Sequence, residues 1–182
     1  MTNESLFGHI AEKFSSNQLE NIATEALAYI INRTKTAKKG FFKFIEAVGI
    51  DSDDNLSIRT QGVGEDDAIP DLVGKDREGK DILIIESKFW AGLTENQPNT
   101  YLRRFPESQK CFLLFIAPVF RFPTLWSELM RRVINEGYNL SQRPDINSEF
   151  YIADVNKNHV LGIVSWRALL SYLLRFFRVF HG

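Results

Sequence analysis

Two charged residues follow a run of branched apolar residues in the stretch DILIIESKFW, residues 81–90. The run from Ile82 to Ile85 is typical of a strand that is buried on both faces. Because side chains alternate along a strand, Glu86 and Lys88 share one face and Ser87 takes the other. An acidic and a basic residue two positions apart often form only a solvated strand edge or a salt bridge. The pair gains a chemical meaning if a second carboxylate lies beside it.

The segment before this strand supplies such a carboxylate. Residues 69–89, IPDLVGKDREGKDILIIESKF, predict a β-hairpin with strands near 69–75 and 81–89, and Gly79 provides the positive φ that the turn requires. With a two-residue turn at Glu78 and Gly79, Asp71 lies directly opposite Glu86. A three-residue turn with a bulge would shift the register by one residue and make the pair diagonal. Either register brings Asp71 within a side chain's reach of Glu86 and Lys88.

Two carboxylates that face each other across a hairpin repel, and a divalent cation between them would remove this conflict. Oxygen ligands suit Mg²⁺ (or Mn²⁺), which takes one or two carboxylates and keeps several waters for substrate phosphates. Lys88 could then polarise an attacking water or stabilise charge that develops on a phosphate. Asp71, Glu86 and Lys88 are therefore candidates for metal-assisted hydrolysis of phosphodiester bonds.

Hydrophobic periodicity and turn residues predict the elements that position these groups. Helices are expected at 17–33, 36–48, 98–105, 124–136 and 166–180, and strands at 57–61, 69–75, 81–89, 111–119, 150–155 and 159–164. Asn17 and Ser165 are the expected N-caps of the first and last of these helices. Helices that alternate with strands after a short meander predict an α/β fold, a mixed β-sheet flanked by helices.

The motif IPD at 69–71, followed after fourteen residues by ESK at 86–88, resembles the PD-(D/E)XK nuclease superfamily. The predicted order of elements is similar to the restriction-endonuclease-like core of that superfamily, which runs helix, three-strand meander, helix, strand. The resemblance implies that Asp71 and Glu86 bind a metal ion together with the backbone carbonyl of Ser87, and that Lys88 assists the attacking water. Within the superfamily, the motifs look most like bacterial nucleases of unassigned or anti-phage type.

A glutamate on the first long helix extends the resemblance. TEAL at 24–27 lies where many members of the superfamily carry a glutamate near the active site, so Glu25 takes that role by resemblance. Glu25 also lies away from the predicted apolar stripe of the helix, which would let it face a cleft. An ordinary exposed helix glutamate is the alternative. The predicted stripe consists of Leu19, Ile22, Ala23, Ala26 and Ile30.

A third motif follows the Glu-x-Lys strand. ENQPNTY at 95–101 is similar to the Gln and Tyr that some branches of the superfamily place at this point. By resemblance, Gln97 would orient the attacking water or a phosphate, and Tyr101 would contact the nucleic-acid backbone. Otherwise Gln97 is a polar residue that opens a helix, and Tyr101 packs in the core.

Composition limits the remaining classes of protein. The chain has 182 residues and a formal net charge of -1, which excludes a global basic field. Its single cysteine excludes an internal disulfide framework. No secretory signal and no stretch of roughly 18 apolar residues is present, so we expect a cytoplasmic protein without a membrane partner. The apolar C-terminal segment SYLLRFFRVFHG suggests a homodimer contact, or a contact with a further domain if residues 1–182 form the first module of a longer protein.

The sequence thus predicts a single nuclease domain over residues 1–182 that cuts DNA with Mg²⁺ or Mn²⁺, with a role in anti-phage defence. Its expected site residues are Glu25, Asp71, Glu86, Ser87, Lys88, Gln97 and Tyr101. Two alternatives remain open. One is a catalytically inactive nuclease fold that binds nucleic acid or another protein, and the other is a nuclease that acts on RNA.

Overall fold

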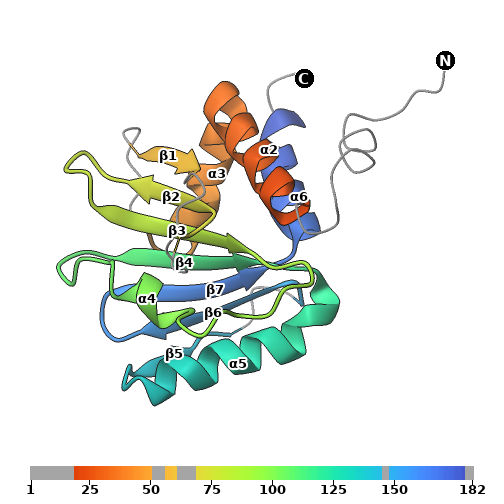
Figure 1. Cartoon of the computed structure of the whole chain (residues 1–182). Coiled ribbons are helices and arrows are strands. Elements are labelled where there is room, and N and C mark those ends of the chain that lie inside the picture. Colours follow the sequence, from red (N-terminus) through yellow and green to blue (C-terminus); the bar gives the residue numbers. More distant parts are fainter. Residues whose placement is uncertain (1–18, 51–55, 61–68, 145–147, 179–182) are drawn as a thin grey trace.

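One mixed seven-stranded sheet forms the centre of the molecule (Figure 1). The computed structural model describes residues 19–50, 56–60, 69–144 and 148–178. The strand order is β1-β2-β3-β4-β7-β6-β5, in which β3, β4 and β7 run parallel and the other neighbours are antiparallel. The strands are β1 (Ser57–Thr60), β2 (Leu72–Lys75), β3 (Asp81–Ser87), β4 (Cys111–Ile116), β5 (Leu140–Gln142), β6 (Phe150–Val155) and β7 (His159–Val164).

Helices cover both faces of this sheet (Figure 1). Neighbouring residues of β6 show the two layers, because Phe150 contacts Phe44 of α3 (Lys35–Ala47), whereas Tyr151 contacts Phe122 of α5 (Phe122–Asn135). Adjacent strand residues point to opposite faces, so α3 and α5 lie on opposite sides. The helices are α2 (Leu19–Arg33), α3 (Lys35–Ala47), α4 (Asn99–Leu102), the 3₁₀ helix η2 (Val119–Arg121), α5 (Phe122–Asn135) and α6 (Trp166–Arg178).

The three parallel strands form the core of the sheet. Every residue of β3, β4 and β7 is buried, which is expected where helices cover both faces of a parallel sheet. The predicted α/β class with a mixed sheet flanked by helices is therefore confirmed. No helix among the described residues is long and apolar enough to cross a membrane.

Most element bounds agree with the sequence prediction to within a few residues. Ser165 caps α6 as predicted, because its Oγ accepts a hydrogen bond from the backbone N–H of Ala168 at 2.9 Å. The other predicted cap, Asn17, lies outside the described residues. The first hairpin strand begins only at Leu72, and the predicted helix 98–105 is reduced to one turn. The short edge strand β5 was not predicted, because its sequence LSQ has no apolar alternation.

The hairpin between β2 and β3 combines the two predicted alternatives. Asp76 N–H donates to the Lys80 carbonyl at 3.0 Å, so three residues form the turn, as in the second of the two alternatives. Gly79 has the expected positive φ of 81°. A bulge follows, because Lys75 pairs with Asp81 but Gly74 pairs with Leu83, and this leaves Ile82 as an extra residue.

The bulge determines where the hairpin ends. Beyond it, Leu72 pairs with Ile85, which is the register that the two-residue turn would have produced. Continued by one residue, this register places Asp71 opposite Glu86, directly rather than diagonally. The extra residue in β3 therefore cancels the extra residue in the turn.

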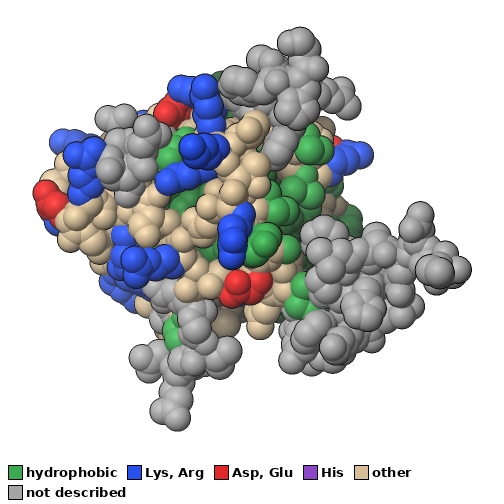
Figure 2. Space-filling model, turned by 90° about the horizontal axis from the view of Figure 1, so that it is seen from above, with side chains coloured by type: hydrophobic (Ala, Val, Ile, Leu, Met, Phe, Trp, Pro, Cys, Tyr) green, Lys and Arg blue, Asp and Glu red, His purple; other side chains and the backbone are tan. Residues whose placement is uncertain are grey.

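The C-terminal helix α6 packs on the sheet side that carries α3. Leu169 and Leu173 are buried, whereas Leu170 and Leu174 are exposed, as is Tyr29 on α2. Figure 2 shows hydrophobic side chains beside Lys and Arg on the face that α2, α3 and α6 form. A dimer or domain contact through α6 stays a prediction.

The closest approach in the core gives a stability prediction. A Cβ added to Gly162 in β7 would lie 2.8 Å from Cε2 of Phe112 in β4. We expect Gly162→Ala to lower the free energy of unfolding by about 1–3 kcal/mol through overpacking, as measured by urea unfolding. Gly92→Ala is the matched control, because a Cβ there meets nothing within 4 Å. Equal stability of the two variants would contradict the close packing of β4 and β7.

Candidate active site

A buried carboxylate organises the end of β3. Oε1 of Glu86 accepts hydrogen bonds from Lys88 Nζ at 2.7 Å and from Gln97 Nε2 at 2.9 Å. Its Oε2 accepts a hydrogen bond from the Tyr101 hydroxyl at 3.0 Å. The side chains of these four residues, called here the Glu86 cluster, are all buried, with Glu86 and Lys88 each only 5% exposed. The structure thus brings together four of the site residues that the sequence predicted.

The loop before α4 fixes the direction of the Gln97 amide. Its Oε1 accepts a hydrogen bond from the backbone N–H of Thr94 at 3.2 Å, so the amide NH₂ points to Glu86 and to the Tyr101 hydroxyl, which lies 2.8 Å away. Burial and the negative charge of Glu86 raise the pKa of Tyr101 well above its ordinary value. Tyr101 therefore stays protonated, and its hydroxyl donates a hydrogen bond to Glu86. Both side chains hold the carboxylate in place.

Asp71 completes the pair of carboxylates at the end of the hairpin. Its Oδ2 accepts a hydrogen bond from the backbone N–H of Ser87 at 2.6 Å. Burial, followed by the charge of Glu86, raises the pKa of Asp71 from 3.8 to about 7, whereas the Ser87 N–H and Lys88 act in the opposite direction. The electrostatic conflict that the sequence predicted is therefore present in the folded chain.

The opposite face of β3 anchors helix α2. Thr24 Oγ1 and Ser87 Oγ lie 2.8 Å apart, and Thr24 also donates to the Glu20 carbonyl at 2.8 Å. A hydroxyl has a single proton, so Ser87 is the donor to Thr24. Ser87 therefore joins the strand to α2 through its side chain and to Asp71 through its N–H, and these bonds leave its carbonyl for a ligand.

The glutamate that α2 directs to the site is Glu20, not Glu25. Oε1 of Glu20 accepts hydrogen bonds from the backbone N–H groups of Phe89 and Trp90, directly after the Glu86 cluster. The charge of Glu20 also contributes to the raised pKa of Asp71. Glu25 is exposed, and the structure does not bring it to the cluster.

The phase of the helix explains this difference. The buried stripe of α2 consists of Thr24, Leu27, Ala28 and Ile31, one position away from several residues of the predicted stripe. Glu20 lies four residues before Thr24 and so shares its face. A hydrogen-bonding threonine on the buried face was the signal that sequence reasoning missed, because only apolar residues were used to define the stripe.

Two arginines hold the loop that follows β3, and sequence reasoning gave neither of them this function. Arg121 donates to the carbonyls of Phe89 and Ala91 at 3.0 and 3.1 Å. Arg132 donates to the Gln97 carbonyl at 2.8 Å and pairs with Glu128. Through these bonds the start of α5 and its third turn fix the loop that carries Gln97.

Asp71 and Glu86 are the two carboxylates of the site that could ligate a divalent cation. Among the described residues, no group of three or more His, Cys, Asp or Glu side chains could hold a metal ion. Asp71 and Glu86 are two carboxylates, which is the number that Mg²⁺ uses when waters fill its other positions. Two donors use Oε1 of Glu86 and one uses Oε2, so the carboxylate keeps one acceptor position on Oε2 for an ion.

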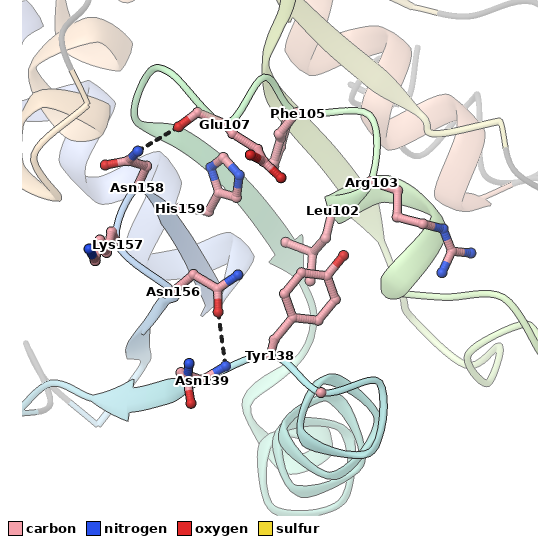
Figure 3. Close-up of a pocket in the computed structure, with 11 residues that line it drawn as sticks. Leu102, Arg103, Phe105, Glu107, Tyr138, Asn139, Asn156, Lys157, Asn158 and His159 are labelled. Carbon is pink, nitrogen blue, oxygen red and sulfur yellow. Dashed lines mark hydrogen bonds between the residues drawn. The ribbon is translucent and has the colours of Figure 1, made fainter.

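Other reactive groups lie apart from this site. Burial raises the pKa of the Cys111 thiol to about 12, which fits a small core residue rather than a nucleophile. His159 lines a separate cavity of about 800 Å³ at the amino ends of β4 and β7, beside Phe105 and Tyr138 (Figure 3). The Glu86 cluster lies at the carboxyl end of β3, where open α/β sheets usually bind their ligands.

Comparisons with known proteins add no relative. No protein-family model matches the chain, and neither a curated protein nor a solved structure matches it. The interpretation of the site therefore depends on its own residues and their geometry.

The raised pKa of Asp71 predicts how stability changes with pH in the absence of metal. Between pH 4 and 7 the folded chain keeps a proton on Asp71 that the unfolded chain has lost, so the free energy of unfolding falls as pH rises through this window. Asp71→Asn should lower this dependence and make the protein more stable than wild type at pH 8. Thermal unfolding in EDTA at pH 4.5 to 8 measures both effects.

Asp76 provides a control of opposite sign. A hydrogen bond from Gln109 lowers the pKa of Asp76, so Asp76→Asn should remove stability that is present at neutral pH and lost as pH falls. Parallel pH profiles for wild type and Asp71→Asn would show that Asp71 is ionised in the folded protein throughout.

Proposed function

We propose that this chain is a metal-dependent nuclease that hydrolyses phosphodiester bonds in DNA, in the manner of the PD-(D/E)XK superfamily that its motifs resemble. One observation carries the proposal: Asp71, whose pKa is raised by Glu86, lies at the end of the hairpin beside a buried Glu86–Lys88 ion pair. A divalent cation would remove the repulsion between the two carboxylates, and the neighbouring ammonium could pair with a phosphate.

Each residue has a separate role in this proposal. Asp71, Glu86 and the Ser87 carbonyl would hold Mg²⁺ or Mn²⁺, which would supply Lewis acidity and an acidified water. Lys88, which contacts Glu86 at 2.7 Å, would orient the attacking water or donate to the phosphate. Gln97 and Tyr101 would orient Glu86 through the hydrogen bonds described above. Glu20, rather than Glu25, would be the helix glutamate beside the active site.

The arrangement of the elements supports the same proposal. The helices α2 and α3 precede the antiparallel strands β1, β2 and β3, and α4 and the parallel strand β4 follow them, so that apart from the additional helix α3 the order is helix, three-strand meander, helix, strand. This is the order expected for a restriction-endonuclease-like core. A role in anti-phage defence would follow from the motifs and is part of the proposal.

Removal of one charge at a time from the site tests the proposal. We expect Glu86→Gln and Lys88→Ala to reduce Mg²⁺-dependent cleavage of plasmid DNA at least about a hundredfold, because each removes a charge that acts at the reacting phosphate. Glu78→Gln and Lys80→Ala are matched controls, since these residues form an exposed ion pair in the turn of the same hairpin. They should cleave as wild type does, and EDTA should stop all cleavage.

Removal of one partner from a buried ion pair also destabilises a protein, so folding must be checked separately. Circular dichroism and the melting temperature of Glu86→Gln serve this purpose. Cleavage by folded Glu86→Gln and Lys88→Ala at the wild-type rate would contradict the site assignment. Cleavage of RNA but not of DNA would contradict the assigned substrate and leave the assigned site unchanged.

One observation favours a second candidate function. Three donors already satisfy the Glu86 carboxylate, as they would in a purely structural polar cluster. In that case the chain is a non-catalytic module that binds nucleic acid or a protein. Titration calorimetry with Mn²⁺ separates the candidates: heat that is lost in Asp71→Asn supports the nuclease, and the absence of any heat supports the module.

A further inference from the structure

Two aromatic rings project into solvent next to the candidate active site. Trp90 is 68% exposed and Phe120 is 61% exposed, and their ring centroids lie 5.4 Å apart with a 37° angle between the planes. Large aromatic side chains are normally buried, so a pair of neighbouring exposed rings requires an explanation.

The exposure of Trp90 is built into the fold. Glu20 accepts the backbone N–H groups of Phe89 and Trp90, and Arg121 donates to the carbonyls of Phe89 and Ala91. The ring of Phe89 stacks on Trp166 at 5.7 Å, so Phe89 points to the protein. The carboxylate of Glu20 on α2 and the guanidinium of Arg121 on η2 therefore hold the backbone on both sides of Trp90.

The rings lie close to the proposed chemistry. Trp90 is two residues beyond Lys88, so their Cα atoms are at most about 7 Å apart. Phe120 belongs to η2, directly after β4, and the backbone N–H of Lys88 bonds to the carbonyl of Ile116 at the end of that strand. Both rings therefore follow the carboxyl ends of the two parallel strands at whose edge the Glu86 cluster lies.

The size of this surface favours a nucleobase over a protein partner. Each ring can bury roughly 150–250 Å², so two rings that are about two-thirds exposed offer much less than the roughly 800 Å² per partner of a standard protein interface. A single base has a flat face of matching size and chemistry. Inside a duplex both faces of each base are covered by its neighbours, so away from the duplex ends only an unpaired base can stack on these rings.

We propose that Trp90 and Phe120 form a stacking platform for an unpaired base of a DNA strand whose phosphates lie at Asp71, Glu86 and Lys88. The platform deepens the proposed function and rests on it. It makes single-stranded or frayed DNA the preferred substrate of the site, because the strand gains base stacking that a closed duplex does not offer.

Binding without metal tests the platform independently of cleavage. Fluorescence anisotropy in EDTA would compare a labelled single-stranded DNA of about 12 nucleotides with a blunt duplex and a single-stranded RNA of the same sequence. We expect Trp90→Leu and Phe120→Leu to weaken binding of the single strand about tenfold and to leave binding of the duplex unchanged.

Two further variants control for general effects. Trp90→Phe should retain binding to within about threefold, because a ring can stack and an aliphatic chain cannot. Tyr29→Leu should bind as wild type does, since Tyr29 is a comparably exposed ring on the outer side of α2. Equal weakening by Trp90→Phe and Trp90→Leu, or no weakening by either, would overturn the platform.

The remaining outcomes separate this inference from the proposed function. Equal dependence on Trp90 for DNA and RNA would support the platform and identify the base as the group recognised, whereas dependence for RNA alone would overturn the assignment to DNA. A protein that binds single strands through Trp90 but never cuts would contradict the nuclease and not the platform. A protein that cuts plasmid DNA but binds single strands without help from Trp90 would contradict only the platform.

Discussion

The buried ion pair between Glu86 and Lys88 is the constraint around which this part of the molecule is built. Removal of two charges from water costs several kcal/mol for each ion, and their attraction offsets this only if the remaining polar atoms are also bonded. Gln97 and Tyr101 provide those bonds, and both lie outside the strand that carries the pair. The sheet must therefore be covered at the end of β3 by a loop of defined shape. The bonds from Arg121 and Arg132 to the carbonyls of that loop maintain its shape.

The two carboxylates of the site are in opposite situations. Glu86 is surrounded by three donors, whereas Asp71 has a raised pKa and accepts one hydrogen bond from the described part of the chain. A protein under selection for stability alone would not place Asp71 next to a buried negative charge, since a neutral residue would be better tolerated there. Local conflicts of this kind are typical of functional sites, where stability is given up for the capacity to bind charge.

Alternation along one strand was enough to predict that Glu86 and Lys88 meet, because a period of two residues leaves no freedom over three positions. The position of Glu20 was not predictable in the same way. It depends on the rotation of α2 about its axis, which goes with the burial of Leu27 and Ile31 and with a hydrogen bond between Thr24 and Ser87, 63 residues apart in the chain. The roles of Arg121 and Arg132 were hidden for a related reason, since their partners are backbone carbonyls, which have no signature in the sequence. The superfamily resemblance and the metal remain predictions.

The bulge at Ile82 has a consequence for how such a site can arise or be lost. If Ile82 were paired instead of bulged, the three-residue turn would carry its own register along the whole hairpin, and Asp71 would lie opposite Ile85 on the other face of the sheet. The carboxylates would then be separated by the sheet itself, although no residue of the site had changed. The chemistry of this edge therefore depends on chain length as much as on residue type. A one-residue deletion in β2 would bring Asp71 opposite Ile85 and disarm the site as effectively as the loss of a carboxylate, whereas deletion of the unpaired Ile82 would leave Asp71 opposite Glu86.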